Sequence, residues 1–277
     1  MKHSEFKLKY RNMNMVREDF RDFNELLRVC DDREPNMDWE KFEYDEPCRI
    51  KNNKSWAGAS YETAVDLLTH GWKEKIAEIK GKLDKSVKAE STKMVRTQKL
   101  GVTGYSPCVP NAIVGVPKSM FYSNKVPKKS KVIEILYDIT FSADVEVEDC
   151  INKGIELLSK IYSLEMNGFR VKLSAVGTYL KDYENDGYIM TVAIKNENQP
   201  IDLSRIAFPL AHPAMLRKIS FDWYERLPNA KYISGYGRPM HYLANSLKNE
   251  ITDAVCAKNT YFIDYYSDLD EVFKSVK

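Results

Sequence analysis

The chain has 277 residues, of which 43% are hydrophobic and 12% aromatic, which is enough for a packed core and argues against wholesale disorder. The formal net charge is only +2, and no apolar run approaches the roughly 20 residues needed to span a bilayer. The N-terminal segment lacks the apolar stretch of a secretory signal, so we expect a soluble protein of the cytoplasm that does not contact membranes.

The first 130 residues are predicted to form a helical and loop-rich region. Apolar residues at helical spacing predict one helix over Val16–Val29 and another from about Tyr61 to Leu83. Residues 84–130 contain many prolines and glycines and are predicted as loop, with short strands or turns at best. Within them the apolar stretch PCVPNAIVGVPKSM is expected to pack in part against the main domain.

Charge is unevenly distributed along this region. Fourteen lysines and arginines face four acids between Lys73 and Lys131, whereas eight acids face two basic residues between Asp31 and Glu46. Such asymmetry fits a surface that binds a polyanion, or two regions that attract each other. The basic side chains that could follow a nucleic-acid backbone are Lys80, Lys82, Lys85, Lys88, Lys93, Arg96 and Lys99. Few aromatic residues are interleaved for base stacking, so a solvated lysine-rich face is the alternative.

From Lys131 onward the pattern is regular. The apolar run Val132–Ile139 predicts a central parallel strand, and Val147–Glu165 has the spacing of an amphipathic helix. Arg170–Val176 predicts a second strand, and Gly187–Ile194 a third that is antiparallel to it because the connection is short. Further helices and strands are predicted over residues 202–227, 231–234, 240–257, 260–265 and 267–277. The fold class is therefore α/β, with a mostly parallel sheet and helices on both faces.

This order of elements resembles the von Willebrand factor A (VWA) fold, a Rossmannoid sheet with one short antiparallel edge strand. In that family the first strand ends in an Asp-x-Ser-x-Ser motif, which begins a metal-ion-dependent adhesion site (MIDAS). Asp138-Ile139-Thr140-Phe141-Ser142 stands at the corresponding place, with Thr for the first Ser. The resemblance implies a VWA-like domain over residues 131–277, with residues 1–130 as a basic N-terminal region packed on it.

The chain also resembles a family of uncharacterised tailed-phage proteins, known only as a domain of unknown function. Four stretches carry this resemblance: WAG at residues 56–58, NKGIELLSKIYSLEMNGFRVKL, FPLAHPAMLRKISFDWYE and GYGRP. They lie toward both ends of the chain, so the resemblance extends over nearly its full length. It implies a bacteriophage origin and brings no established activity.

Three oxygen-bearing side chains of the strand-end motif are candidate metal ligands: Asp138, Thr140 and Ser142. Oxygen ligands of this kind suit Mg²⁺ or Mn²⁺. The MIDAS of the resembled family also needs a Thr and an Asp from later loops. The loop before residue 205 offers Asp202 and Ser204 but no Thr, and residues 234–237 contain no Asp. We therefore expect a degenerate MIDAS and no cofactor, with a bound Mg or Mn ion as the alternative.

Other candidate residues lie in loops. His212, His241 and Arg238 are interpreted as loop anchors or exposed groups, since no GxSxG or Cys/His signature accompanies them. Neither GxGxxG nor GxxxxGK[ST] occurs, so no phosphate-binding loop is predicted. The five scattered cysteines form no CxxC pair, and the histidines have no HxH or HxxxH spacing, which argues against disulfides and zinc.

These observations favour a non-enzymatic phage protein that acts by protein–protein contact through a VWA-like domain in the infected host cell. The expected partner is a phage or host protein. One alternative is a nucleic-acid-associated protein that uses residues 73–131. The other is a divalent-metal-dependent enzyme built on Asp138.

Overall fold

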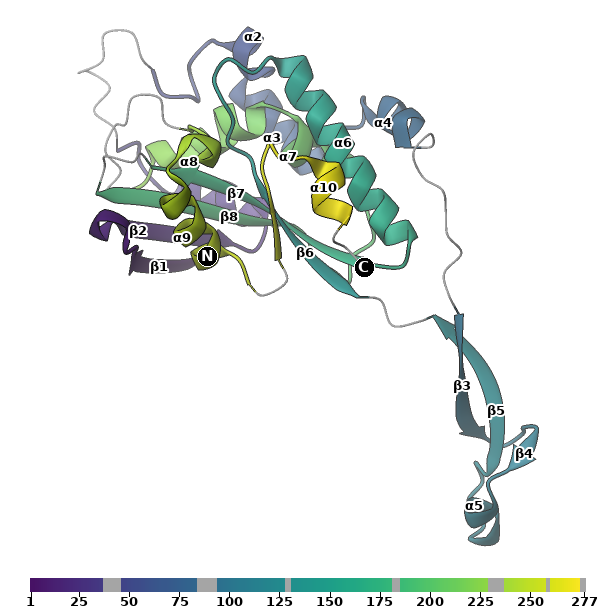
Figure 1. Ribbon diagram of the computed structural model, residues 1–277. Coiled ribbons are helices and arrows are strands. Elements are labelled where there is room, and N and C mark those ends of the chain that lie inside the picture. Colours follow the sequence, from purple (N-terminus) through teal and green to yellow (C-terminus); the bar gives the residue numbers. More distant parts are fainter. Residues whose placement is uncertain are drawn as a thin grey trace.

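A six-stranded sheet forms the centre of the protein in the computed structural model, which describes residues 1–36, 46–83, 94–127, 131–180, 185–228, 237–257 and 260–274. The strand order is β1-β2-β8-β7-β6-β9 (Figure 1). The strands are β1 (Lys2–Lys7), β2 (Asn14–Phe20), β6 (Val132–Asp138), β7 (Arg170–Tyr179), β8 (Asp186–Lys195) and β9 (Thr260–Ile263). Three of the five strand pairs are parallel, so the predicted α/β class with a mostly parallel sheet is confirmed.

The predicted strand–helix–strand unit is present as β6, α6 (Val147–Met166) and β7. Alternate residues of β6 enter different cores, with Ile135 in the larger core on one face of the sheet and Leu136 in the smaller core on the other. Burial on both faces explains why this strand is apolar almost throughout. Gly168 follows the end of α6 with φ of 85°, a conformation that glycine adopts without strain.

β8 is antiparallel to β7, as predicted, but it is an interior strand. Its second neighbour is β2, which runs parallel to it from the pair Asn14–Asp186 to the pair Phe20–Val192. The predicted helix over Val16–Val29 is therefore wrong in its first half, because pairing with a distant strand overrides local propensity. A helix begins only at Phe23, after the side chain of Asp22 accepts a hydrogen bond from the backbone N–H of Glu25.

Helices cover both faces of the sheet (Figure 1). The larger core lies under α6 and the following helices: α1 (Phe23–Asp31), α3 (Tyr61–His70), α7 (Leu203–Ala211), the π-helix η3 (Met215–Ser220), α8 (Phe221–Glu225) and α10 (Leu269–Lys274). The smaller core lies under α9 (Asn245–Val255), near the 3-10 helices η1 (Tyr10–Asn12) and η4 (Met240–Tyr242). None of the helices within the described ranges combines the length and apolarity that crossing a membrane requires.

The predicted helix from Tyr61 to Leu83 is divided in two. Ser60 caps α3, but Gly71 ends it with φ of 84°, and the chain resumes as α4 (Ile76–Leu83). A Cβ atom on residue 71 would lie 2.9 Å from Ser204 Oγ, so α7 requires glycine at this close approach.

Residues 94–127, here called the arm, form a separate three-stranded sheet in the order β3-β5-β4. Its elements are β3 (Met94–Gly101), β4 (Ser106–Pro107), α5 (Val109–Ile113) and β5 (Met120–Pro127). Figure 1 shows the arm projecting away from the six-stranded sheet. The prediction of loop with short strands is wrong here, because β3 and β5 pair along their full length. The expectation that part of PCVPNAIVGVPKSM packs against the main domain is also wrong, since none of its residues belongs to either core and Ile113 is 81% exposed.

Candidate functional site

The carboxyl end of β6 is a switch point in the topology of the sheet. From β6 the chain passes through α6 to β7 on one side, whereas β9 pairs with β6 on the other side. Open α/β sheets bind ligands in the crevice outside such a point. The crevice here is a cavity of about 520 Å³, bordered by the loop that follows β6.

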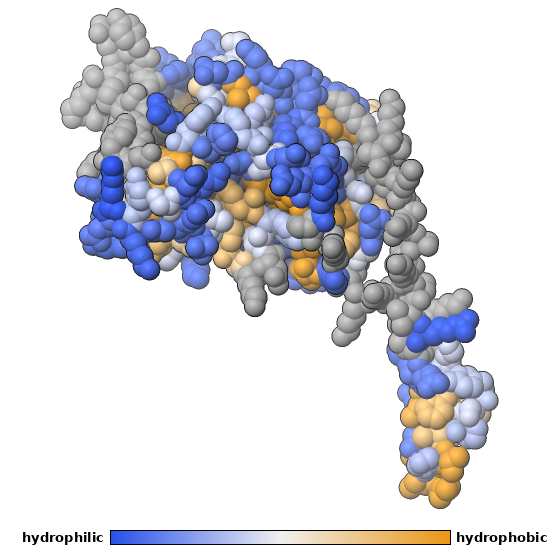
Figure 2. Space-filling view, viewed as in Figure 1, coloured by the Kyte–Doolittle hydropathy of each residue, from blue (hydrophilic) through white to orange (hydrophobic). Residues whose placement is uncertain are grey.

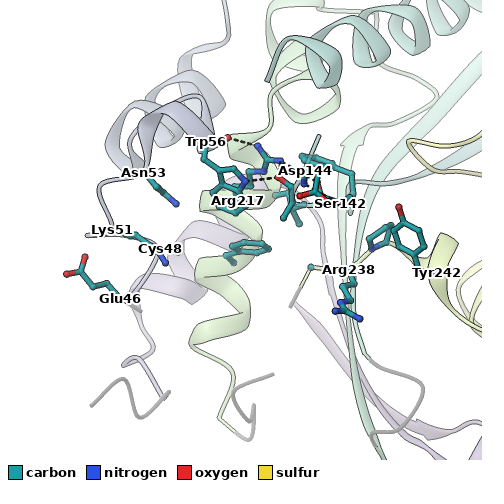
Figure 3. Close-up of a pocket in the computed structure, with 16 residues that line it drawn as sticks. Glu46, Cys48, Lys51, Asn53, Trp56, Ser142, Asp144, Arg217, Arg238 and Tyr242 are labelled. Carbon is teal, nitrogen blue, oxygen red and sulfur yellow. Dashed lines mark hydrogen bonds between the residues drawn. The ribbon is translucent and has the colours of Figure 1, made fainter. Parts of the chain in front are cut away.

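The cavity lies between two walls (Figure 3). One wall contains α2 (Lys54–Ala57) and the chain before it, and the other contains the turn from Gly237 to Tyr242. Between the walls lie the loop after β6 and the π-helix η3. The lining residues are Glu46, Cys48, Lys51, Asn53, Trp56, Phe141, Ser142, Ala143, Asp144, Leu216, Arg217, Phe221, Gly237, Arg238, Pro239 and Tyr242.

Arg217, in η3, connects the first wall of the cavity to the loop after β6. Its guanidinium donates hydrogen bonds to the main-chain oxygens of Trp56, Ala143 and Val145, the last over 2.8 Å. The same group lies 4.3 Å from the centre of the Trp56 ring, within the range of a cation–π contact. Only 1% of Arg217 is exposed, and burial lowers the pKa of its guanidinium. Within the described ranges no carboxylate forms an ion pair with this cation.

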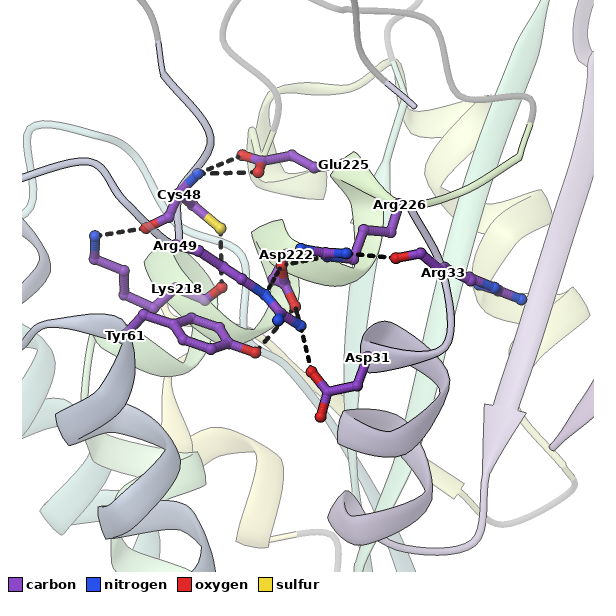
Figure 4. Close-up of polar contacts among 9 residues, drawn as sticks. All are labelled: Asp31, Arg33, Cys48, Arg49, Tyr61, Lys218, Asp222, Glu225 and Arg226. Carbon is purple, nitrogen blue, oxygen red and sulfur yellow. Dashed lines mark hydrogen bonds and ion pairs between the residues drawn. The ribbon is translucent and has the colours of Figure 1, made fainter. Parts of the chain in front are cut away.

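The first wall is held to η3 and α8 by buried polar contacts (Figure 4). Lys218 Nζ donates to the main-chain oxygens of Cys48 and Lys51, each over 2.8 Å. The backbone N–H of Cys48 donates to Glu225 Oε2 over 3.0 Å, and its thiol donates to the main-chain oxygen of Lys218. Burial raises the pKa of the Cys48 thiol well above its ordinary value, as is typical of structural cysteines.

The strand-end motif, residues 138–142 (DITFS), has some side chains in the core and others at the cavity. Asp138 and Thr140 are fully buried, and the hydroxyl and backbone N–H of Thr140 donate to Asp138 Oδ1 over 2.7 and 2.9 Å. Ser142 instead lines the cavity, where its hydroxyl donates to Asp144 Oδ2 over 3.3 Å. The three candidate ligands therefore do not present one converging set of oxygens.

Asp138 is the most perturbed carboxyl group at this edge of the sheet. Burial, with a smaller contribution from the nearby Asp264, raises the pKa of its side chain to about 7, although the hydrogen bonds from Thr140 oppose this shift. Its Oδ2 has no hydrogen-bond partner among the described residues. Asp264 directly follows β9 and is itself buried, with Ser267 Oγ donating to its Oδ1 over 2.6 Å. In the part of the chain that the structure describes, no group of three or more His, Cys, Asp and Glu side chains could hold a metal ion. Because Asp138 and Thr140 bond to each other inside the core while Ser142 lines the cavity, these three side chains do not fit the MIDAS of the resembled family.

Asp202 and Ser204 lie away from the DITFS motif. β8 ends at Lys195, which pairs with Leu173 near the beginning of β7, so the chain leaves the sheet at the edge opposite Asp138. The side chains of Asp202 and Ser204 bond to each other at the start of α7, where Ser204 Oγ donates to Asp202 Oδ1 over 2.7 Å. Their arrangement is that of an N-terminal helix cap.

The two loop histidines have packing roles. His212 is buried, stacks on Phe208 and accepts a hydrogen bond at Nδ1 from the backbone N–H of Ala214 over 3.1 Å. Burial lowers the pKa of His212 to about 4, so its ring is neutral near pH 7. His241 is exposed and stacks on Tyr266 with 4.5 Å between ring centres.

Of the predicted basic residues, those whose side chains the structure describes lie on two separate elements. Lys80 is exposed on α4, whereas Arg96 and Lys99 are exposed on the arm. Lys82 lies in α4, while Lys85, Lys88 and Lys93 are outside the described residues.

Of the predicted site residues, Ser142 and Arg238 reach the cavity. Sequence reasoning did not identify Trp56, Arg217 and Tyr242 as site residues, because only the folded chain brings these three segments together. One signal was present, since Trp56 and Arg217 both lie in stretches that carry the resemblance to the phage family.

The fold and the cavity define an α/β protein with a mixed, mostly parallel sheet and a ligand-sized crevice at its switch point. The chain belongs to the family described as Domain of unknown function (DUF7192), whose family model matches residues 4–276. Comparison with curated proteins and with solved structures gave no match.

Proposed function

We propose that the protein is a non-enzymatic binding protein, and that the tip of its arm contacts a protein partner. The observation that carries this proposal is the concentration of exposed apolar side chains on the arm. Eight of the thirteen large hydrophobic residues that are exposed within the described ranges belong to it: Leu100, Val102, Tyr105, Val109, Ile113, Val114, Val116 and Tyr122. Contiguous exposed apolar surface of this kind marks interaction sites.

The tip of the arm, at the end of α5, is highly exposed. Ile113 and Val114 are 81% and 78% exposed, at the end of the short helix α5. Figure 2 shows this end of the arm as an orange surface, at the extremity farthest from the main body. None of the arm side chains that the structure describes belongs to either hydrophobic core, so folding of the main body does not explain the apolar character of the tip. A partner that covers these side chains does explain it.

The origin and fold proposed for this binding protein rest on resemblance. The strand order β8-β7-β6-β9, with β8 antiparallel and Asp138 at the end of β6, supports a VWA-like domain with a degenerate metal site. The stretches shared with tailed-phage proteins support a phage origin, and hence a phage or host partner in the cytoplasm of the infected cell. These are inferences by analogy.

Photo-crosslinking in infected cells tests the proposal. A photoreactive amino acid at Ile113 should give an adduct with one discrete protein, identified by mass spectrometry. The same amino acid at Ile50, which is 70% exposed on the main body, is the matched control and should not give that adduct. The double variant Ile113→Asp, Val114→Asp should abolish co-purification of the partner. Identical adducts from both positions, or none from Ile113, would contradict a binding role of the tip.

A second candidate function is contact with nucleic acid. Lys99 on β3 lies opposite Tyr122 on β5, and both are exposed, so the arm presents a cation beside an aromatic ring. Such pairs bind single-stranded nucleic acid by charge and stacking. This function is excluded if the protein does not bind a DNA or RNA oligonucleotide at low salt. It is also excluded if the affinity does not fall as the salt concentration rises.

A further inference from the structure

We propose that the cavity at the carboxyl end of β6 binds a nucleoside monophosphate, with its base among the aromatic side chains and its phosphate near Arg238. This inference is independent of the role of the arm, which lies elsewhere in the molecule (Figure 1). The cavity of about 520 Å³ is in the range of small-molecule sites in proteins, roughly 300–1,000 Å³.

Aromatic rings on both walls account for recognition of a base. Trp56 in the first wall is fixed by two contacts, because Nε1 donates to the Ala143 main-chain oxygen over 2.9 Å and Arg217 lies against its ring. Phe221 lies beside it, with 6.4 Å between ring centres. Tyr242 projects from the opposite wall and is 60% exposed (Figure 3). A planar base between these walls would cover the exposed ring of Tyr242 by stacking.

Positive charge accounts for recognition of a phosphate. Arg217 is a buried cation whose hydrogen bonds go to main-chain oxygens, so its charge is not cancelled by a described carboxylate within ion-pair distance. Arg238 is exposed at the opposite wall and makes no hydrogen bond or ion pair with any described residue. A guanidinium in this state is available to bind a phosphate in a bidentate manner.

The other charges of the lining limit the size of the anion. Lys51 adds a third cation, while Glu46 and Asp144 contribute two carboxylates. The carboxylate of Asp144 already accepts a hydrogen bond from Ser142. The sequence contains neither GxGxxG nor GxxxxGK[ST], the glycine loops that cradle a di- or triphosphate. One phosphate group therefore matches this lining better than a chain of two or three.

Isothermal titration calorimetry on the full chain at low salt tests this inference, with AMP, GMP, CMP and UMP as probes. The corresponding nucleosides and inorganic phosphate are the two comparison series. At least one monophosphate should bind tenfold more tightly than both its nucleoside and inorganic phosphate. Arg238→Gln and Tyr242→Ala should each weaken that binding by tenfold or more, and both positions are exposed, so the variants should melt like the parent protein.

Two matched variants separate the cavity from the rest of the surface. Arg205→Gln removes an exposed arginine at the start of α7, and Tyr105→Ala removes a tyrosine that is 61% exposed on the arm. Both should keep the parent affinity. The inference is overturned if no monophosphate binds at millimolar concentration, or if a monophosphate binds no more tightly than inorganic phosphate. It is equally overturned if Arg205→Gln weakens binding as much as Arg238→Gln.

Discussion

Arg49 and Asp222 form a partly buried ion pair between segments 173 positions apart in the chain (Figure 4). Arg49 Nε donates to Asp222 Oδ1 over 2.6 Å, and Nη2 donates to Oδ2 over 2.8 Å. The carboxylate also accepts hydrogen bonds from the Tyr61 hydroxyl and from Arg226 Nε. This single side chain therefore connects α8 to two separate parts of the N-terminal region.

Loss of the Asp222 carboxylate should destabilise the protein strongly. Asp222→Ala leaves Arg226 without its anion and Arg49 with only the exposed Asp31, and breaking a buried pair costs about 3–5 kcal/mol. We expect the free energy of unfolding in urea to fall by that amount. Asp66→Ala removes a carboxylate from an exposed pair with His70 and should leave the free energy of unfolding nearly unchanged. Equal effects of the two substitutions would show that the Asp222 network adds no stability.

The stability of the fold should depend on pH through Asp138. Burial raises the pKa of this carboxyl group from its ordinary value of 3.8 to about 7, so the folded protein holds the proton more tightly than the unfolded chain. The resulting stabilisation is complete below pH 3.8 and is lost as the pH rises to about 7. Asp138→Asn cannot ionise and avoids this loss.

Urea denaturation at pH 5 and pH 8 measures the effect. From pH 5 to pH 8 the parent should lose up to about 3 kcal/mol relative to Asp138→Asn, at about 1.4 kcal/mol per pKa unit. Asp144→Asn changes an exposed carboxylate in the same loop, so its stability should follow the parent at both pH values. A constant difference between the parent and Asp138→Asn would mean that Asp138 is ionised in the folded protein throughout this range.

Close packing of α6 on α7 should make Gly154 intolerant of substitution. A Cβ atom at this position would lie 2.2 Å from the Cα of Ala211 and 2.5 Å from the main-chain oxygen of Leu210, so the helices would have to separate. We expect Gly154→Ala to cost about 1–3 kcal/mol. Gly81→Ala is the matched change in α4, where nothing lies within 4 Å, and it should stabilise by up to about 1 kcal/mol. Thermal melting should show a lower melting temperature than the parent for Gly154→Ala and an equal or higher one for Gly81→Ala.

Removal of the arm should leave the main body folded. Met94 pairs with Pro127, so the arm begins and ends at adjacent points, and a short Gly-Ser linker can replace residues 94–127. The melting temperature should stay within experimental error of the parent value, while co-purification of the partner should be lost. A clear fall in melting temperature would show that the arm contributes to the core after all.

Elements with local sequence signals were predicted from the sequence. The apolar run of β6 and the helical spacing of α6 both depend on residues close together in the chain. The short connection before β8 was likewise enough to predict that this strand is antiparallel to β7.

Elements that depend on distant partners were not predicted. β2 contains Arg17 and Asp19, and it is built into the main sheet by pairing with β8, far along the chain. The proximity of Asp138 and Asp264 follows from the pairing of β6 with β9, which no local pattern reveals. The cavity required three segments to meet, and neither Trp56 nor Arg217 has a local pattern that indicates a binding site.

The position of β2 between β1 and β8 has a consequence for synthesis of the protein. Residues 14–20 leave the ribosome long before their partner strand at residues 186–192. Until then, β2 has a row of unpaired amide and carbonyl groups along one side, and such an edge can pair with other chains. During translation this early strand is therefore the segment at which two nascent copies could join, and release of β8 removes the hazard.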